Sequence, residues 1–211
     1  IVLAGVHNSL RSQTQTRLND EFLGYDMDRV QKLTGTEKRI GVKRMFPDHG
    51  DVQTLTSSNQ NGDFNKRIAS QIGVFPMREG PPLILVIKKN VSILKNLINW
   101  VTSICNEHDK KGRPHLSNIP TLVIDDECDY ASINTKEPEL DEDGNPIDEW
   151  DPTATNRLIR KLLTVFDRCA YVGYTATPYA NIFIHKDRKH PKYGDDLFPR
   201  SFIISLPTPS N

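Results

Sequence analysis

Short apolar runs alternate with amphipathic stretches along this chain. The clearest run, at 83–87, reads Leu-Ile-Leu-Val-Ile after two prolines and is typical of a buried strand. Runs at 1–4, 121–124 and 171–174 have the same character, and a last strand is expected at 202–205. Because these runs are apolar throughout rather than at every second position, the strands are expected to be covered on both faces.

Amphipathic segments lie between these strands and predict helices. Asn90 is a favourable N-cap for a segment whose apolar residues recur every three or four positions up to Cys105. Gly73 is a favourable stop for a short helix that Asp63 is expected to cap. The alternation predicts the α/β class, with a mainly parallel sheet and helices on both faces. Helices are expected near 10–22, 64–72, 91–105 and 155–166, and one further strand at 39–45.

Composition narrows the class of protein. The 211 residues suit one α/β domain, and 36% hydrophobic and 26% charged residues indicate a globular chain. Lys+Arg and Asp+Glu both number 27, so nucleic-acid binding would need a local basic patch. Three dispersed cysteines argue against disulfides or zinc and favour a reducing, cytoplasmic location. No apolar run approaches the roughly 20 residues of a membrane span.

The residues best suited to bind a ligand lie at the carboxyl end of one predicted strand. Parallel sheets bind ligands beyond the carboxyl ends of their strands. Neighbouring carboxylates repel one another unless a cation neutralises them, and Mg²⁺ with phosphate ligands is a common partner. The alternative is a solvated acidic loop. A phosphoacceptor receiver domain is disfavoured, because the next strand end, at 174–177, offers no aspartate. The acidic residues that directly follow strand 121–124 are Asp125, Asp126, Glu127 and Asp129.

A second motif, Thr175-Ala176-Thr177-Pro178, follows one helix–strand unit later. The two motifs resemble the DExD and S/T-A-T motifs of superfamily-2 helicases. With the opening 3–15 and the residues that follow each motif, 131–135 and 179–181, the chain is similar to the Z-one domain family from residue 1 to about 184. That family accompanies restriction and phage-defence systems and has a helicase-like ATPase core, and endonuclease activity has been suggested for it.

The resemblance implies a RecA-like P-loop NTPase core that uses ATP and Mg²⁺. Asp126 would hold the metal and Glu127 would position the hydrolytic water. Asp129 would contact Thr175 or Thr177 and couple the nucleotide state to the bound strand.

The resemblance also implies that nucleic acid, DNA in our interpretation, binds at neighbouring strand ends. For the two adjacent lysines of this set, a solvated loop is an equally weighted alternative. Partner proteins of a restriction or defence system are expected too. The residues placed at the nucleic acid are Asn8, Arg11, Gln13, Lys88 and Lys89.

No G-x-x-x-x-G-K-[ST] phosphate-binding loop occurs in the sequence. We therefore expect residues 1–211 to be a partial RecA-like domain, a fragment whose phosphate loop lies upstream, with an acidic excursion at 136–152. The isolated chain is expected not to hydrolyse ATP. A missing strand would expose a sheet edge, through which the chain could form a homo-oligomer.

Two other functions remain open from the sequence. The first is a metal-dependent endonuclease that uses the same carboxylate cluster to hold two metals, with His115 or His185 approaching in space. The second is a non-catalytic scaffold with a motor-like fold.

Overall fold

The computed structural model describes residues 1–26, 39–105, 107–133, 153–182, 184, 189–190 and 193–207. A four-stranded sheet in the order β4-β1-β7-β8 forms its centre, and every neighbouring pair is parallel. This confirms the predicted α/β class with a parallel sheet. The four strands are β1 (Val2–Ala4), β4 (Val86–Ile87), β7 (Thr121–Asp126) and β8 (Cys169–Tyr174).

The register of the sheet aligns the carboxyl ends of its strands. Asp126 lies opposite Ala4 on one side and opposite Tyr174 on the other. Leu3 pairs in turn with Ile87. The residues that follow these four strands therefore meet at one edge of the sheet, as the sequence predicted.

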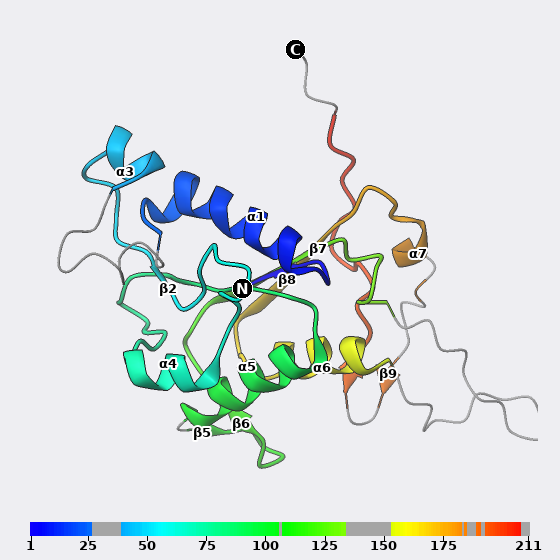
Figure 1. Ribbon diagram of the computed structural model, residues 1–211. Coiled ribbons are helices and arrows are strands. Elements are labelled where there is room, and N and C mark those ends of the chain that lie inside the picture. The colour runs from blue at the N-terminus through cyan, green and yellow to red at the C-terminus, as the bar shows by residue number, and fades with distance from the viewer. Residues whose placement is uncertain are drawn as a thin grey trace, which may run out of the picture.

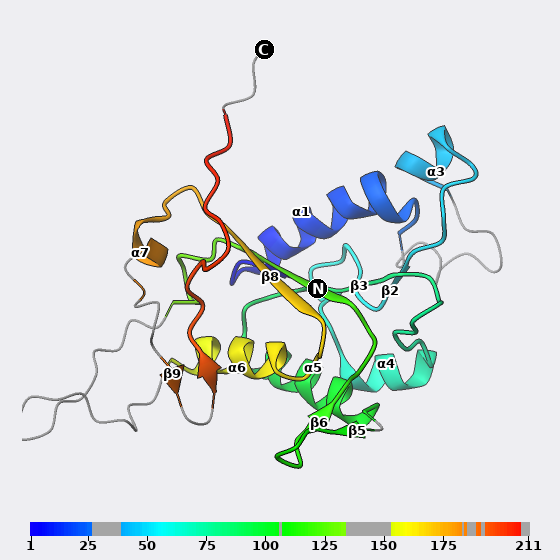
Figure 2. The same ribbon diagram turned by 180° about the vertical axis from the view of Figure 1, so that it is seen from behind.

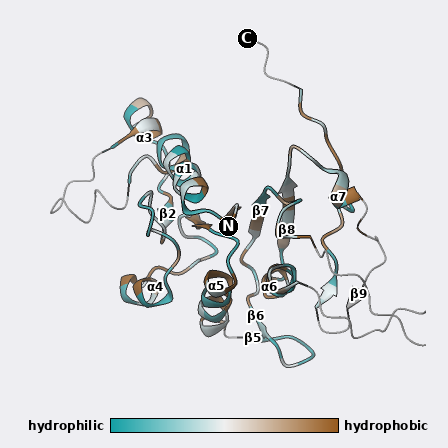
Figure 3. Ribbon diagram, turned by 45° about the vertical axis from the view of Figure 1, so that its right-hand side comes forward, coloured by the Kyte–Doolittle hydropathy of each residue, from teal (hydrophilic) through white to brown (hydrophobic). Residues whose placement is uncertain are grey.

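Helices cover both faces of the sheet, as Figures 1 and 2 show. On one side lie α5 (Val91–Ser103) and α6 (Ala154–Leu163), whose apolar residues join the main hydrophobic core with Leu3, Ile87 and Val123. On the other side lies α1 (Asn8–Leu18). Figure 3 shows both hydrophobic and hydrophilic residues along α5. No helix in the described part of the chain is long and apolar enough to cross a membrane.

Short elements complete the described fold. β2 pairs in parallel with β3, which only Leu85 separates from β4. Asn90 caps α5 by accepting from the backbone N–H groups of Ser92 and Ile93, as predicted. The remaining elements are the π-helix η1 (Asn19–Leu23), α3 (Gly41–Met45), β2 (Gln53–Thr54), α4 (Lys66–Ile72), β3 (Leu83–Ile84), β5 (Glu107–His108), β6 (Pro114–His115), α7 (Tyr179–Ile182), β9 (Lys189–His190) and β10 (Gly194–Asp195).

Three sequence predictions of secondary structure were wrong. Residues 41–45 form helix α3 rather than a strand, because they pack on η1 with Gly41 directly against the backbone of Asp20. Residues 202–205 form no strand, since an apolar run needs a pairing partner and none is present among the described residues. The cap of α4 is Asn65 rather than Asp63, although Gly73 ends that helix as predicted.

Candidate functional site

The acidic residues lie on the last part of β7 and the turn that follows it, which we call the acidic turn (residues 125–130). The backbone of Glu127 has a φ of 53°, in the left-handed region that non-glycine residues rarely adopt. The N–H of Cys128 donates to the carbonyl of Tyr174 at 3.0 Å, and the N–H of Tyr130 donates to the carbonyl of Glu127 at 2.9 Å. The reversal sends the carboxylates in different directions.

Asp125 points into the interior of the protein. Its side chain is fully buried, and its Oδ1 lies 3.1 Å from Nζ of Lys89, which is also fully buried. Its Oδ2 accepts a hydrogen bond of 2.6 Å from the hydroxyl of Tyr171. Burial, together with the negative charge of Asp125, raises the pKa of Tyr171 well above its ordinary value, so the phenol stays a donor. Asp125 is therefore a buried, paired charge.

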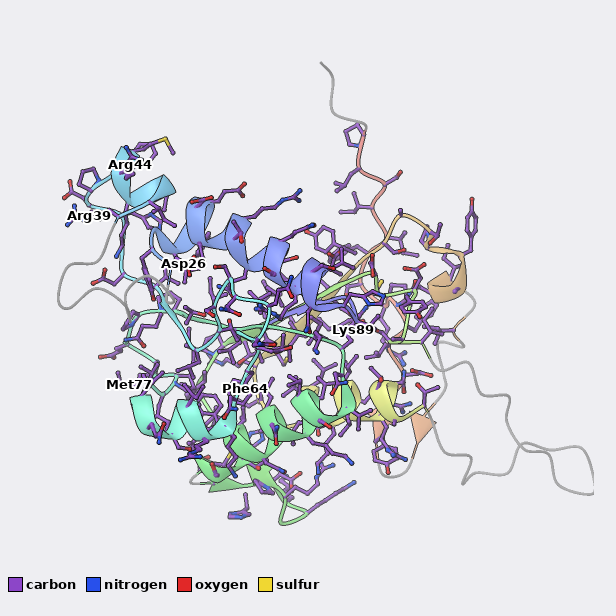
Figure 4. The ribbon with its side chains drawn as sticks, in the orientation of Figure 1. Asp26, Arg39, Arg44, Phe64, Met77 and Lys89 are labelled. Carbon is purple, nitrogen blue, oxygen red and sulfur yellow. The ribbon has the colours of Figure 1, made fainter. Side chains whose placement is uncertain are left out.

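Lys89 is the second residue after the end of β4, and Figure 4 shows it at the edge of the sheet where α1 begins. Its ammonium donates to the backbone carbonyls of Asp126, Glu127 and Tyr130 at 2.7, 2.6 and 3.0 Å. One cation thus contacts both the buried carboxylate and the backbone of the acidic turn.

Asp129 is the carboxylate that joins the two sequence motifs. Its Oδ1 accepts from the hydroxyl of Thr175 at 2.6 Å, and its Oδ2 accepts from the hydroxyl of Thr177 at 2.5 Å. The sequence had led us to expect a contact with one threonine, and the structure contains both. Burial alone would raise the pKa of Asp129, but the two hydroxyl hydrogen bonds, a backbone hydrogen bond and the charge of Lys89 together hold the pKa below the ordinary value.

Asp126 and Glu127 are the two carboxylates of the turn whose side chains are exposed to solvent. Asp126 borders a mainly apolar hollow between the sheet and α1, lined by Val2, Thr14, Arg17, Leu18, Ile124 and Tyr174. Glu127 lies over the backbone of Gly5, so close that a Cβ on residue 5 would come within 3.1 Å of its Oε2. Of the four carboxylates of the turn, these two are therefore available to a ligand.

Whether the acidic turn can hold Mg²⁺ depends on which of its carboxylates are exposed. No group of three or more metal-ligating side chains occurs in the described ranges. An all-protein cage is thus absent from that part of the molecule. Mg²⁺ commonly binds through one or two carboxylates and takes its other ligands from phosphate and water. The exposed carboxylate of Asp126 fits such a site, whereas a two-metal cluster of all four carboxylates does not fit, since Asp125 and Asp129 have other partners.

The predicted nucleic-acid residues divide into exposed and buried ones. Gln13 is exposed, while Asn8 and Lys88 are half-buried. Arg11 is fully buried and donates to the backbone carbonyls of the loop 57–62. The structure therefore gives Arg11 and Lys89 internal partners in place of the nucleic-acid contacts predicted for them.

The histidines proposed for an endonuclease do not join the site in the described residues. His115 belongs to β6, in a hairpin that precedes the first residue of β7, so it lies at the amino end of the strands. The acidic turn lies at their carboxyl end. His185 and the acidic excursion at 136–152 lie outside the described residues.

Sequence reasoning missed Tyr171 and the polar anchorage of α1. Tyr171 was assigned only to a strand, and its partner Asp125 is 46 residues away. The face of α1 that is buried carries Arg11 and Gln15 rather than apolar residues. The weak apolar periodicity of this helix was the available signal that polar side chains anchor it.

Comparisons with known proteins give no assignment for this chain. No family model matches it, no curated protein matches it, and no solved structure matches it.

Proposed function

We propose that this chain carries the hydrolysis motif and the coupling motif of a helicase-like, nucleic-acid-dependent ATPase with a RecA-like core, acting in restriction or phage defence. The observation that supports the proposal best is the pair of hydrogen bonds from Thr175 and Thr177 to Asp129. Two segments 46 residues apart, each resembling a helicase motif, meet through the residues to which coupling was assigned.

The geometry supports a division of labour within the acidic turn. Asp126 would hold Mg²⁺, which neutralises the charge of the ATP phosphates. Glu127, beside it and exposed, would orient the attacking water and accept its proton. Asp129 transmits any displacement of the turn to the segment after β8, because both threonine hydroxyls bind its carboxylate.

Nucleic acid, DNA in this proposal, would lie across the carboxyl edge near Asn8, Gln13 and Lys88. Partner proteins of a defence system remain part of the proposal. Self-association through β8 is proposed as well, because in the described sheet β8 pairs with β7 alone.

The endonuclease alternative is weaker. It needs several carboxylates free for metal, whereas Asp125 is paired with Lys89 and Asp129 is bound by two hydroxyls. A plasmid-cleavage assay separates the two functions: ATP-independent cutting that disappears in Asp126→Ala would establish the nuclease. A scaffold would show neither activity.

The ATPase proposal is tested with Glu127→Gln. We expect no Mg²⁺-dependent ATP hydrolysis by the 211-residue chain alone, because it contains no G-x-x-x-x-G-K-[ST] loop. In a natural chain that contains this sequence together with a phosphate-binding loop, Glu127→Gln should abolish hydrolysis and leave ATP binding intact. Glu107→Gln, at an exposed position in β5, is the matched control and should hydrolyse ATP normally. Full activity of Glu127→Gln would refute the assignment.

A further inference from the structure

The ammonium of Lys89 uses all of its donors on the acidic turn. A lysine has three N–H donors, and three backbone carbonyls of the turn accept from Nζ within 3.0 Å. Asp125 Oδ1, at 3.1 Å, lies within ion-pair distance but has no hydrogen-bond partner. Lys89 therefore forms an ion pair with Asp125, while its hydrogen bonds go to the backbone carbonyls of the turn.

The backbone of the acidic turn needs such a partner. Glu127 within the turn and Ala131 directly after it both have positive φ, at 53° and 63°, and neither is a glycine. Such a conformation is unfavourable for a residue other than glycine and persists only where the surrounding structure holds it. Carbonyls that converge on one point also repel one another, because their oxygens carry partial negative charge. A buried cation at the point of convergence removes that repulsion.

We infer that Lys89 is a positioning residue: its ammonium fixes the backbone of the acidic turn and so sets the directions of Asp126, Glu127 and Asp129. Asp125 forms an ion pair with Lys89 and holds it in place, and Tyr171 orients Asp125 through its hydroxyl. The catalytic consequence rests on the function proposed above, whereas the positioning itself does not require nucleotide.

A simpler role for Lys89 would be to neutralise Asp125, with the carbonyl contacts incidental. Removing one partner of a buried ion pair is strongly destabilising, so Lys89→Met alone does not separate the two roles. The double variant Lys89→Met/Asp125→Asn removes both charges, and its asparagine keeps an oxygen that can accept from Tyr171. If neutralisation were the whole role, this variant would restore the turn as well as the stability.

Cys128 provides the readout, because its thiol is buried inside the acidic turn. A buried thiol is protected from alkylation, because the reagent has to reach the sulfur. Cys105, two residues after the end of α5, is an internal reference outside the turn. Alkylation by iodoacetamide at pH 8, resolved by peptide mass spectrometry, measures both thiols in one sample, and Lys88→Met is the control variant.

We expect iodoacetamide to alkylate Cys128 at least tenfold faster in the double variant than in the wild type. Cys105 in the double variant, and both thiols in Lys88→Met, should react within twofold of their wild-type rates. The inference would be overturned if Cys128 in the double variant reacted within twofold of its wild-type rate. Equal acceleration of Cys128 and Cys105 would also overturn it, because the whole protein would then have lost structure. Neither result depends on ATP, so a failed ATPase test leaves this result interpretable.

Discussion

The two hydroxyl hydrogen bonds on Asp129 can be removed with little change of volume. Thr175→Val and Thr177→Val each replace one donor by a methyl group, while the carboxylate stays in place. Thr175 is half-buried and Thr177 is exposed, so solvent can replace the second donor more readily than the first.

The expected losses follow from this difference in exposure. A hydrogen bond to a charged group contributes about 1.5–3 kcal/mol when it is protected from solvent. We expect Thr175→Val to lower the free energy of unfolding by about 1.5 kcal/mol at pH 7. Thr177→Val should lower it by about 0.5 kcal/mol, because exposed interactions of a charge are screened. The two effects should not add, since both donors bind one carboxylate.

The pH dependence has a definite sign. The pKa of Asp129 is lower in the folded protein than the ordinary value of 3.8, so its stabilising contribution is present above that value. The contribution is lost as the pH falls through the folded pKa. In the double valine variant burial remains without the hydroxyls, so the pKa of Asp129 should rise. The stability difference between wild type and variant should therefore shrink below about pH 4.

Urea denaturation at pH 7 and pH 3, with a carbon-detected NMR titration of the Asp129 carboxylate, measures both effects. Thr164→Val is the control, because that hydroxyl donates to a backbone carbonyl on the surface of α6. If the threonine variants lose no more free energy of unfolding than the control does, and the pKa of Asp129 is unchanged, the hydroxyl contacts have no energetic role.

Three further predictions concern the fold around the site. Gly173→Ala should destabilise the protein by about 2 kcal/mol in a thermal melt, since its Cβ would lie 2.7 Å from the sulfur of Cys128; an unchanged melt would mean that the turn yields easily. Arg11→Met should cost about 3 kcal/mol in urea, because buried backbone carbonyls lose their donors, and a loss below about 1 kcal/mol would contradict the anchoring role. If β8 pairs with a second copy, sedimentation at high concentration should show a dimer that Ala170→Lys reduces to monomer, because a charge on an edge strand opposes pairing; a wild-type monomer would refute self-association there.

The sheet was predictable from sequence because its strands read as continuous apolar runs. The burial that such runs imply holds for β1 and β4, whereas Leu122 of β7 and Tyr174 of β8 are exposed. The meeting of Asp129 with the threonines was predictable because both follow parallel strands that end at one edge. The pairing of Lys89 with Asp125 was not, because a lysine at a strand end is normally solvated and nothing in the local pattern marks burial. The run at 202–205 shows the converse: it is apolar, yet Phe202, Ile203 and Ile204 are exposed, because hydropathy does not reveal whether a pairing strand exists.

Asp125 and Asp126 are chemically identical neighbours with opposite surroundings, because successive residues of a strand face opposite sides of the sheet. The first lies against Lys89 and the second borders the hollow beside α1. Inserting or deleting a single residue between 121 and 124 would exchange their environments, even though the Asp-Asp pair itself stayed intact. The length of β7 therefore determines the site as much as the acidic residues do. Related proteins with the same site should share the spacing from the start of the strand to Asp125 as well as the acidic motif.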